Sequence, residues 1–174
     1  MKFYSGKGDK GTTTLFGSGK RIPKTNKIFE TLGALDELNS YLGVCVSLAR
    51  DKKVKKILIE VQENLFILQA ELGGAKVKPL GQEKLELLEK TTDNFGDKVG
   101  IITKFTLPGG SPLSAYLDYA RTLARRAERI YLMVSPSSTN RAAAYLNRLS
   151  SLLFVLARYS NKKTGIKENN PSYK

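Results

Sequence analysis

The sequence contains no histidine and only one cysteine, Cys45. Without histidine, the chain lacks the most common general base of enzymes, the most common zinc ligand and any histidine ligand to a haem or corrin. A single cysteine excludes an internal disulfide and a metal site built from several cysteines, and it fits a reducing compartment. We therefore expect no resident metal site. The absence of histidine therefore constrains the possible chemistry more than any single motif in the sequence does.

Long hydrophobic runs are also missing. The longest apolar stretches are far shorter than the roughly 20 residues of a membrane-spanning helix. Residues 1–6 have neither the apolar core of a signal peptide nor the Arg- and Ser-rich pattern of an organelle leader. We expect a cytoplasmic protein with no membrane partner.

Acidic residues are scarce relative to basic ones, because 16 Asp and Glu against 29 Lys and Arg give a formal net charge of +13. Clustered basic residues would indicate binding to a phosphate backbone. Here the lysines are spread along the chain, and no aromatic stacking motif is interleaved with them. We favour a solvated basic surface and expect no nucleic-acid partner. The open alternative is a non-catalytic, basic helical-bundle oligomer that binds nucleotide or nucleic acid.

The length of 174 residues is enough for one domain with its own core, spanning residues 1–174. Residues 1–27 are rich in Gly, Thr, Lys and Ser and lack helical periodicity, which predicts a loop with short extended pieces. Residues 28–160 are predicted to form a helical bundle, and residues 161–174 a basic tail.

Apolar residues recur at intervals of three and four along most of the chain, which is typical of amphipathic helices. The expected helices cover residues 28–49, 54–72, 82 to about 95, 112 to about 134, and a last segment that ends near residue 159. Ser111 is predicted to cap the fourth helix with Pro112 in its first turn, and residues 135–138 are predicted to end it. Since no strand series or internal repeat accompanies these segments, the fold class is all-α. We predict a five-helix up-and-down bundle with an extended Gly-rich N-terminal loop.

Charged and polar side chains interrupt the apolar helices. Arg121, Arg125 and Glu128 follow i, i+4, i+7 spacing and share one strip of the fourth helix. They could be surface pairs that contribute about 0.2 to 0.5 kcal/mol each. Asp36, another acid within an apolar helix, could instead pair with Arg121 across the bundle and position a ligand. Asn147 lies off the apolar stripe of the fifth helix, where a solvated side chain and a site residue are both open readings.

The N-terminal loop Gly6–Gly11 matches the pattern G-x-G-x-x-G. No hydrophobic strand precedes it and no βαβ unit surrounds it, so a dinucleotide-binding fold is excluded, and the residues that follow do not complete a P-loop. Glycines still allow backbone N–H groups to approach phosphate oxygens. Further donors are available from Lys7, Lys10, Thr12, Thr13 and Thr14. Phosphate binding and a plain flexible N-terminus remain equally open from this segment alone.

Taken together, segments that cover nearly the whole chain resemble the PduO-type ATP:cob(I)alamin adenosyltransferases. The matching segments are Tyr4–Thr13, Arg21–Lys24, Leu32–Ser40, Phe105–Gly110, Ala124–Arg129 and Leu146–Ser150. The resemblance implies a homotrimer of five-helix bundles, with ATP held between neighbouring subunits and the corrin nearby. One departure concerns the loop, which commonly reads Thr-Arg-Thr-Gly-Asp in the family and Ser-Gly-Lys-Gly-Asp here. Side-chain contacts from positions 6 and 7 are therefore expected to differ.

The resemblance also assigns site residues. The implied ATP-binding residues are Ser5, Gly6, Lys7, Gly8, Asp9, Gly11, Thr13, Thr14, Lys24, Arg125, Arg126, Glu128, Arg129 and Asn147. Arg125 is implied to be the principal phosphate clamp, and Asp36 with Arg121 a pair on the corrin side or between subunits, so these three are the implied catalytic residues. Phe105 by itself suggests only a core residue, but the resemblance implies that it covers the lower face of cobalamin.

The implied reaction explains why histidine can be absent. Cob(I)alamin is itself a strong nucleophile that attacks the 5′ carbon of ATP and expels triphosphate, so the protein must align the reactants and neutralise the leaving group. The implied substrates are ATP with Mg²⁺ and cobalamin as Co(I). The implied partners are a cobalamin-reducing enzyme and an acceptor enzyme that uses the product. A purely structural assembly protein is a third hypothesis.

Overall fold

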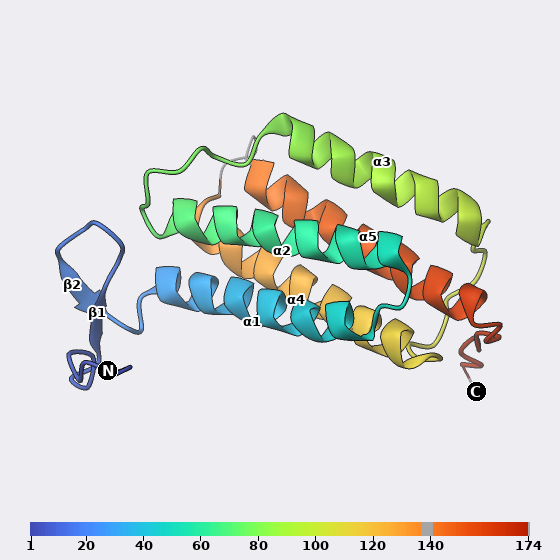
Figure 1. Ribbon diagram of the computed structural model, residues 1–174, viewed down its shortest axis with the longest axis horizontal. Helices are drawn as coiled ribbons and strands as arrows, with labels where there is room; N and C mark the ends of the chain where they lie inside the picture. The colour runs from blue at the N-terminus through green and yellow to red at the C-terminus, as the bar shows by residue number, and fades with distance from the viewer. Residues whose placement is uncertain (137–140, 174) are drawn as a thin grey trace.

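The computed structural model describes residues 1–136 and 141–173. In this part of the chain, five helices lie side by side and a two-stranded hairpin precedes them (Figure 1). The elements are β1 (Thr12–Thr14), β2 (Arg21–Pro23), α1 (Lys27–Leu48), α2 (Lys52–Leu72), α3 (Gln82–Val99), α4 (Pro112–Val134) and α5 (Arg141–Lys163). Successive helices run in alternating directions, so the predicted up-and-down bundle is confirmed. The hairpin projects from the bundle at the start of α1, at the opposite end from the C-terminus.

Polar residues cap the N-termini of α1 and α4. Asn26 caps α1, since its side chain accepts a hydrogen bond from the Ile28 N–H at 3.1 Å. The Ser111 hydroxyl accepts from the Ser114 N–H at 3.3 Å, and Pro112 follows in the first turn, as predicted for α4. The predicted end of α4 is also correct, with Ser135 as its C-cap. Ser137 and Ser138, which were expected to help end it, lie outside the described residues.

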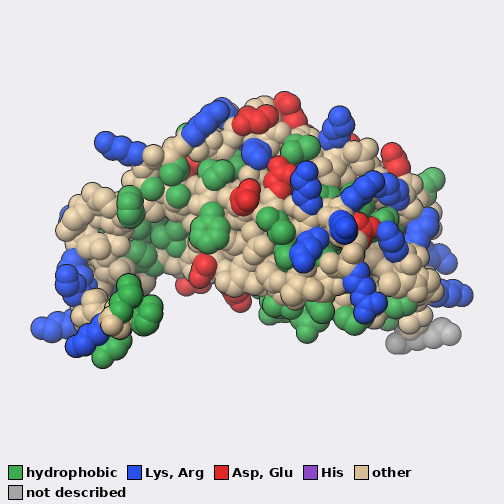
Figure 2. Space-filling model, in the orientation of Figure 1, with side chains coloured by type: hydrophobic (Ala, Val, Ile, Leu, Met, Phe, Trp, Pro, Cys, Tyr) green, Lys and Arg blue, Asp and Glu red, His purple; other side chains and the backbone are tan. Residues whose placement is uncertain are grey.

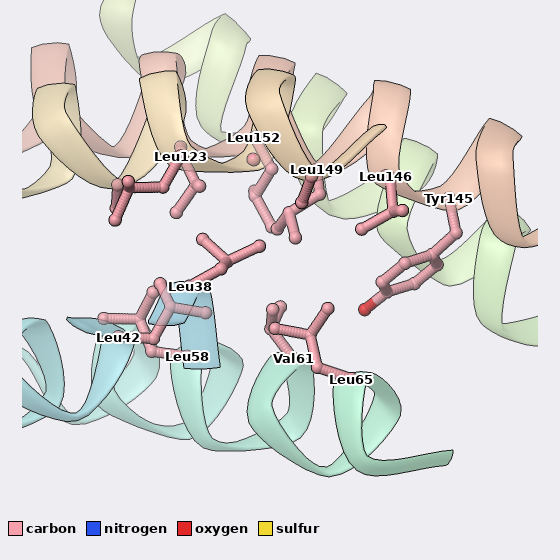
Figure 3. Packing of buried hydrophobic residues seen from close by; sticks show 14 of the residues in the cluster. Leu38, Leu42, Leu58, Val61, Leu65, Leu123, Tyr145, Leu146, Leu149 and Leu152 are labelled. Atoms are coloured by element: carbon pink, nitrogen blue, oxygen red, sulfur yellow. The ribbon is translucent and has the colours of Figure 1, made fainter. Parts of the chain in front are cut away.

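The core is built from aliphatic side chains of all five helices, and Figure 3 shows its central part. Leu38, Leu65 and Leu149 are fully buried, and they approach from α1, α2 and α5. Cys45 is also fully buried, and burial raises the pKa of its thiol to about 12. The thiol therefore stays protonated near neutral pH and is no candidate nucleophile. None of the described helices combines the length and apolar content needed to cross a membrane.

Two helices extend beyond their predicted ends. α3 continues to Val99 and stops at Gly100, whose φ of 91° is a conformation that glycine adopts without strain. α5 continues to Lys163, so its predicted end near residue 159 is wrong. The pattern of large apolar residues stops at Leu156, and beyond the buried Ala157 the buried positions are polar: Arg158, Ser160 and Asn161. In the last turns of α5, hydrogen-bonded polar side chains fill the buried positions, so the apolar periodicity does not show that the helix continues.

Asp51, the N-cap of α2, also connects the turn between α1 and α2 to α5. Its carboxylate accepts from the Lys53 N–H at 2.8 Å and from the Tyr159 hydroxyl at 3.1 Å, and it forms an ion pair with Lys163 at 2.7 Å. Lys163 in particular lowers the pKa of Asp51 from 3.8 to about 2. A lowered carboxyl pKa stabilises the fold above pH 4, and this contribution is lost as the pH falls towards 2.

We expect Asp51→Asn to lower the urea midpoint slightly at pH 7, because asparagine still caps the helix but cannot form the ion pair. The difference from the parent protein should shrink between pH 4 and pH 2, where Asp51 itself becomes neutral. Urea unfolding across this pH range measures the effect, with the exposed Asp93→Asn as a control. A difference that stays constant with pH would contradict the assigned role of the charge.

Candidate functional site

The N-terminal loop is held in place by Arg21. Strands β1 and β2 pair antiparallel, which brings the Arg21 side chain back over residues 7–12. Its Nε donates to the Thr12 hydroxyl at 2.9 Å, and its Nη2 donates to the carbonyls of Lys7 at 2.6 Å and Thr12 at 2.5 Å. Gly6 and Gly11 have φ values of 67° and 73°, which non-glycine residues rarely adopt. The loop thus has a defined shape rather than an arbitrary one.

Lys24 lies directly against this loop. Its backbone N–H donates to the Gly11 carbonyl at 2.9 Å. A Cβ atom at Gly8 would be 3.0 Å from the Lys24 ammonium nitrogen, so a side chain at Gly8 would displace that ammonium group. In the described part of the chain, no acidic side chain forms an ion pair with Lys24 or Lys7. The loop and Lys24 together present an uncompensated positive charge suited to an anionic ligand.

A second polar group lies on α4 and α5. The Asn147 amide donates to the Glu128 carboxylate at 2.8 Å, and its carbonyl oxygen accepts from Arg148 Nη1 at 2.7 Å. Both Glu128 and Asn147 are half-buried. The reading of Asn147 as a simply solvated side chain is therefore wrong, and the structure brings together two of the residues that the resemblance implied to bind ATP.

The arginines of α4 differ in their environments. Arg126 forms an ion pair with Glu37 on α1, so its guanidinium is already engaged. Arg125 and Arg129 are exposed, and among the described residues neither has a carboxylate partner. Arg125 lies one turn before Glu128 on the same strip. Its guanidinium offers several unshared donors in a planar fork, which suits phosphate oxygens.

Asp36 and Arg121 do not pair within one protomer. Asp36 is exposed and faces a surface groove of about 620 Å³ on the side of α2, lined also by Phe66 and Gln69. Arg121 is half-buried on α4, and its buried Nε has no hydrogen-bond partner in the described part of the molecule. Pairing across one bundle is therefore wrong, because the two side chains face different neighbours. The unpartnered Nε is a buried polar atom that still requires an acceptor.

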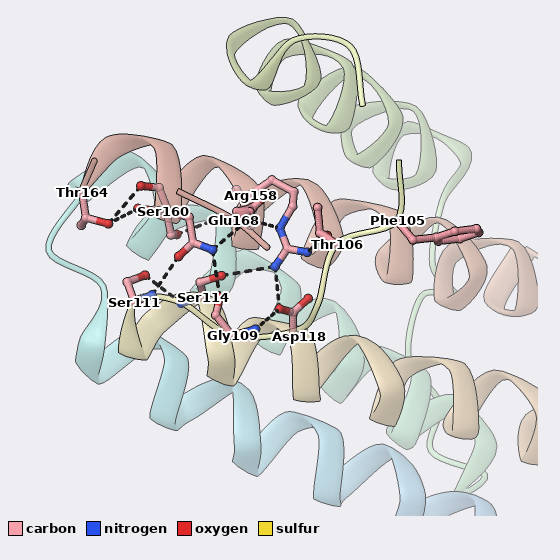
Figure 4. Close-up of polar contacts among 12 residues, drawn as sticks. Phe105, Thr106, Gly109, Ser111, Ser114, Asp118, Arg158, Ser160, Thr164 and Glu168 are labelled. Atoms are coloured by element: carbon pink, nitrogen blue, oxygen red, sulfur yellow. Dashed lines mark hydrogen bonds and ion pairs between the residues drawn. The ribbon is translucent and has the colours of Figure 1, made fainter. Parts of the chain in front are cut away.

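Phe105 is not a core residue, in contrast to what its position alone suggested. It is 80% exposed in the segment between α3 and α4. Figure 4 shows its ring directed away from a polar cluster formed around Arg158. The backbone carbonyl of Phe105 accepts a hydrogen bond from the Asn170 side chain at 2.7 Å. An exposed aromatic ring on a tethered backbone is available to a ligand or partner.

The polar cluster itself was not predicted. Its charged members are Arg158, Asp118 and Glu168, and the first two have side chains that are 2% and 4% exposed. A signal was present in the sequence, since Arg158 and Asp118 each occur among apolar residues of a helix, as Asp36 does. Nothing in their spacing could have indicated that the C-terminal segment returns to contact them.

The N-terminal loop and the α4 and α5 residues form two separate groups in one protomer. Among the described residues, no hydrogen bond or ion pair joins residues 1–24 to α4 or α5. In Figure 1 the hairpin projects away from these helices. Each group carries unshared donors for an anion, so a complete site would need both groups to approach the same ligand.

Comparison with known proteins identifies the class to which this fold and these residues belong. The sequence profile of the cobalamin adenosyltransferase family matches residues 3–160. The chain belongs to that family. A corrinoid adenosyltransferase of Citrobacter freundii is 41% identical over 165 residues, which cover 90% of this chain and 93% of that protein. A second Citrobacter freundii protein, the corrinoid adenosyltransferase PduO, is 39% identical over 166 residues. That match covers 91% of this chain but only 49% of the relative, so this chain spans about half of the longer protein.

Two solved structures of a PduO-type adenosyltransferase from Lactobacillus reuteri have the same fold. A phenylalanine-to-alanine variant complexed with cobalamin and ATP superimposes with a TM-score of 0.89 and 30% identity, covering 98% of this chain and 99% of that one. An arginine-to-lysine variant complexed with ATP gives a TM-score of 0.86 and 31% identity, covering 97% and 99%. The phenylalanine and arginine replaced in these variants are separated by the same number of positions as Phe105 and Arg125.

Proposed function

We propose that this protein transfers the 5′-deoxyadenosyl group of ATP to the cobalt of cob(I)alamin, giving adenosylcobalamin and triphosphate. One observation carries the proposal. Arg125 has no acidic partner in the described part of the chain and lies beside the hydrogen-bonded pair of Glu128 and Asn147, in a chain that matches the cobalamin adenosyltransferase family over residues 3–160. In the transfer, an electron pair of Co(I) forms the bond to the 5′ carbon. The bond from that carbon to the triphosphate oxygen breaks, and triphosphate leaves with its electrons.

The residues of this chain supply binding and charge rather than a base. ATP enters as its Mg²⁺ complex, and the loop amides with Lys24 surround the phosphates. Arg125 binds the triphosphate as negative charge develops on its leaving oxygen, which is the type of stabilisation that contributes most in such sites. The 2.8 Å hydrogen bond from Asn147 to Glu128 holds these two side chains in place next to Arg125. The remaining proposed members of the site are Ser5–Asp9, Gly11, Thr13, Thr14, Arg129 and Arg126, the last of which also pairs with Glu37.

The active form is a homotrimer, with the N-terminal loop of one subunit completing the α4 and α5 residues of its neighbour. The separation of these two groups in one protomer supports this arrangement. Exposed apolar side chains gather along the lower edge of the molecule in Figure 2, over α1 and the start of α4. The exposed apolar residues of these two helices include Val44, Tyr116 and Tyr119, and Tyr41 packs against both tyrosines at ring distances of 5.8 and 4.9 Å. Such a patch is typical of a surface covered in an oligomer.

Asp36 and Arg121 pair between subunits in this trimer. The buried Nε of Arg121, which has no hydrogen-bond partner among the described residues, still requires an acceptor, and the exposed carboxylate of Asp36 is available to supply one. We expect Asp36→Arg and Arg121→Asp each to lower turnover by about 100-fold, and the double variant to recover part of the loss. Steady-state kinetics with analytical ultracentrifugation measure both turnover and assembly, with Glu63→Arg on α2 as the control. A double variant no better than the single variants would contradict the pair.

Phe105 covers the lower face of the corrin and keeps the lower ligand off the cobalt. The exposed, tethered ring supports this role. The protein acts as one cytoplasmic domain. It binds cob(II)alamin, a reducing enzyme supplies the electron that converts Co(II) to Co(I), and the adenosylcobalamin product passes to an enzyme that uses it.

The phosphorus product tests the proposed reaction. Phosphorus NMR of a mixture of protein, MgATP and chemically reduced cob(I)alamin should show triphosphate formed in equal amount to the cobalamin consumed. Release of phosphate or diphosphate would indicate a different reaction of ATP. Saturable nucleotide binding without any turnover, together with salt-sensitive binding to nucleic acid, would favour the basic binding protein.

A further inference from the structure

We infer that Arg158 and Glu168 are positioning residues for the corrinoid site, because they hold the C-terminal segment 164–173 against the loop that carries Phe105. The inference rests on the proposed function for the meaning of Phe105. The attachment itself is a property of the contacts described below and does not depend on that function.

Arg158 connects three separate parts of the chain. Its Nη2 contacts Asp118 Oδ2 on α4 at 2.5 Å, and its Nη1 donates to the hydroxyl of Thr106 at 2.7 Å. Its Nε lies 2.6 Å from Glu168 Oε1 in the C-terminal segment. Thr106 is the immediate neighbour of Phe105. One buried guanidinium therefore links α4, the Phe105 loop and the C-terminal segment (Figure 4).

Asn161 holds the following part of the same loop. Its amide donates to the Gly109 carbonyl at 2.9 Å and to Glu168 Oε1 at 2.8 Å, and its carbonyl oxygen accepts from the Ser111 N–H at 2.8 Å. Gly110 has a φ of 102°, and a Cβ atom there would lie 2.4 Å from the Asn161 carbonyl oxygen. Only glycine fits at this position, so the loop passes against the cluster in one conformation.

The C-terminal segment attaches directly to the backbone on both sides of Thr106. The Leu107 N–H donates to the Asn169 carbonyl at 2.8 Å, and the Asn170 side chain donates to the Phe105 carbonyl at 2.7 Å. Glu168, one residue earlier, is the charged contact of this segment with the cluster. The backbone of Phe105 is thus fixed while its ring remains exposed.

The cluster is better explained by positioning than by stability. Buried ion pairs are weak contributors to net stability, because the cost of desolvation offsets most of the attraction. The apolar core already joins α4 to α5. By contrast, Ile166 and Tyr173 of the C-terminal segment are 37% and 83% exposed, so apolar burial does little to hold this segment. Its place beside the Phe105 loop depends on the polar contacts.

The test compares Glu168→Gln and Asn170→Ala with Asn169→Ala in the full-length protein. Asn169 contributes its backbone carbonyl to Leu107, so the alanine variant keeps that contact and serves as the matched control. The first readout is hydrogen exchange of residues 105–111 in protein without corrinoid. We expect exchange to be about tenfold faster in the two test variants and unchanged in the control.

The second readout is the electron paramagnetic resonance spectrum of cob(II)alamin bound with MgATP. This spectrum reports the fraction of Co(II) that is four-coordinate, meaning that the lower ligand is off the cobalt. We expect this fraction to be several-fold smaller in Glu168→Gln and Asn170→Ala, with unchanged affinity for ATP. Wild-type exchange in both test variants would overturn the inference, and so would faster exchange with an unchanged four-coordinate fraction. A parent protein that forms no adenosylcobalamin would instead refute the proposed function, and the exchange data would still decide whether the segment positions the loop.

Discussion

Replacing Arg125 by alanine is expected to lower adenosyl transfer by about 1,000-fold while the oligomer persists. The guanidinium has no carboxylate partner among the described residues, so its loss removes donors to the triphosphate without leaving a charge unpaired in the protein. Because the developing charge appears on the leaving group, we expect the defect mainly in kcat rather than in ATP binding. Stopped-flow absorbance with cob(I)alamin and MgATP measures it.

Two further variants sharpen this test. Arg125→Lys keeps the charge but loses the planar fork, so it should bind ATP and fall between the alanine variant and the parent protein in rate. Arg50→Ala, an exposed arginine at the turn before α2, is the control and should leave the rate unchanged. Near-normal turnover in Arg125→Ala would remove Arg125 from the site. It would also favour a role of α4 in packing alone.

Replacing Phe105 by alanine is expected to impair the reaction that begins from cob(II)alamin far more than the transfer from chemically prereduced cob(I)alamin. The ring is proposed to keep the lower ligand away from cobalt, which makes Co(II) easier to reduce. Once Co(I) is supplied, this task is already complete. We expect a loss of about 100-fold in the first assay and less than about tenfold in the second.

The control for Phe105 is Phe66→Ala, another exposed phenylalanine, on α2. It should leave the ratio of the two rates unchanged. Equal losses of the two activities in Phe105→Ala would contradict a role in reduction. That result would indicate that Phe105 only contributes to binding the corrinoid.

Elements with local signals at both ends could be predicted from the sequence. Ser111 and Pro112 mark the start of α4 and Ser135 its end, so the bounds Pro112–Val134 were predicted correctly. The end of α5 could not be predicted in this way. Asn161 is buried through hydrogen bonds to the Gly109 carbonyl and the Ser111 N–H in the segment before α4, and periodicity does not report such bonds.

The candidate site was predictable only where its members share one element. Helical spacing predicted that Arg125 and Glu128 lie on one strip, and family resemblance added Asn147, which the structure places against Glu128. Family membership, which the resemblance predicted, is confirmed by the match over residues 3–160. The roles of the site residues stay predictions.

Contacts between distant segments could not be predicted from the sequence. Spacing shows which face of a helix carries Asp36 or Arg121, but it does not show which chain supplies the opposite charge. The segment containing Glu168, Asn169 and Asn170 has no periodic pattern, and its polar residues are typical of a loose terminus. Its attachment to Phe105 and Leu107 emerges only from the three-dimensional arrangement.

Anaerobic absorbance of chemically reduced cob(I)alamin with this protein and MgATP tests the central claim most directly. The account predicts that the cob(I)alamin spectrum disappears and that chromatography identifies the corrinoid product as adenosylcobalamin. An unchanged cob(I)alamin spectrum with folded, nucleotide-saturated protein would contradict it.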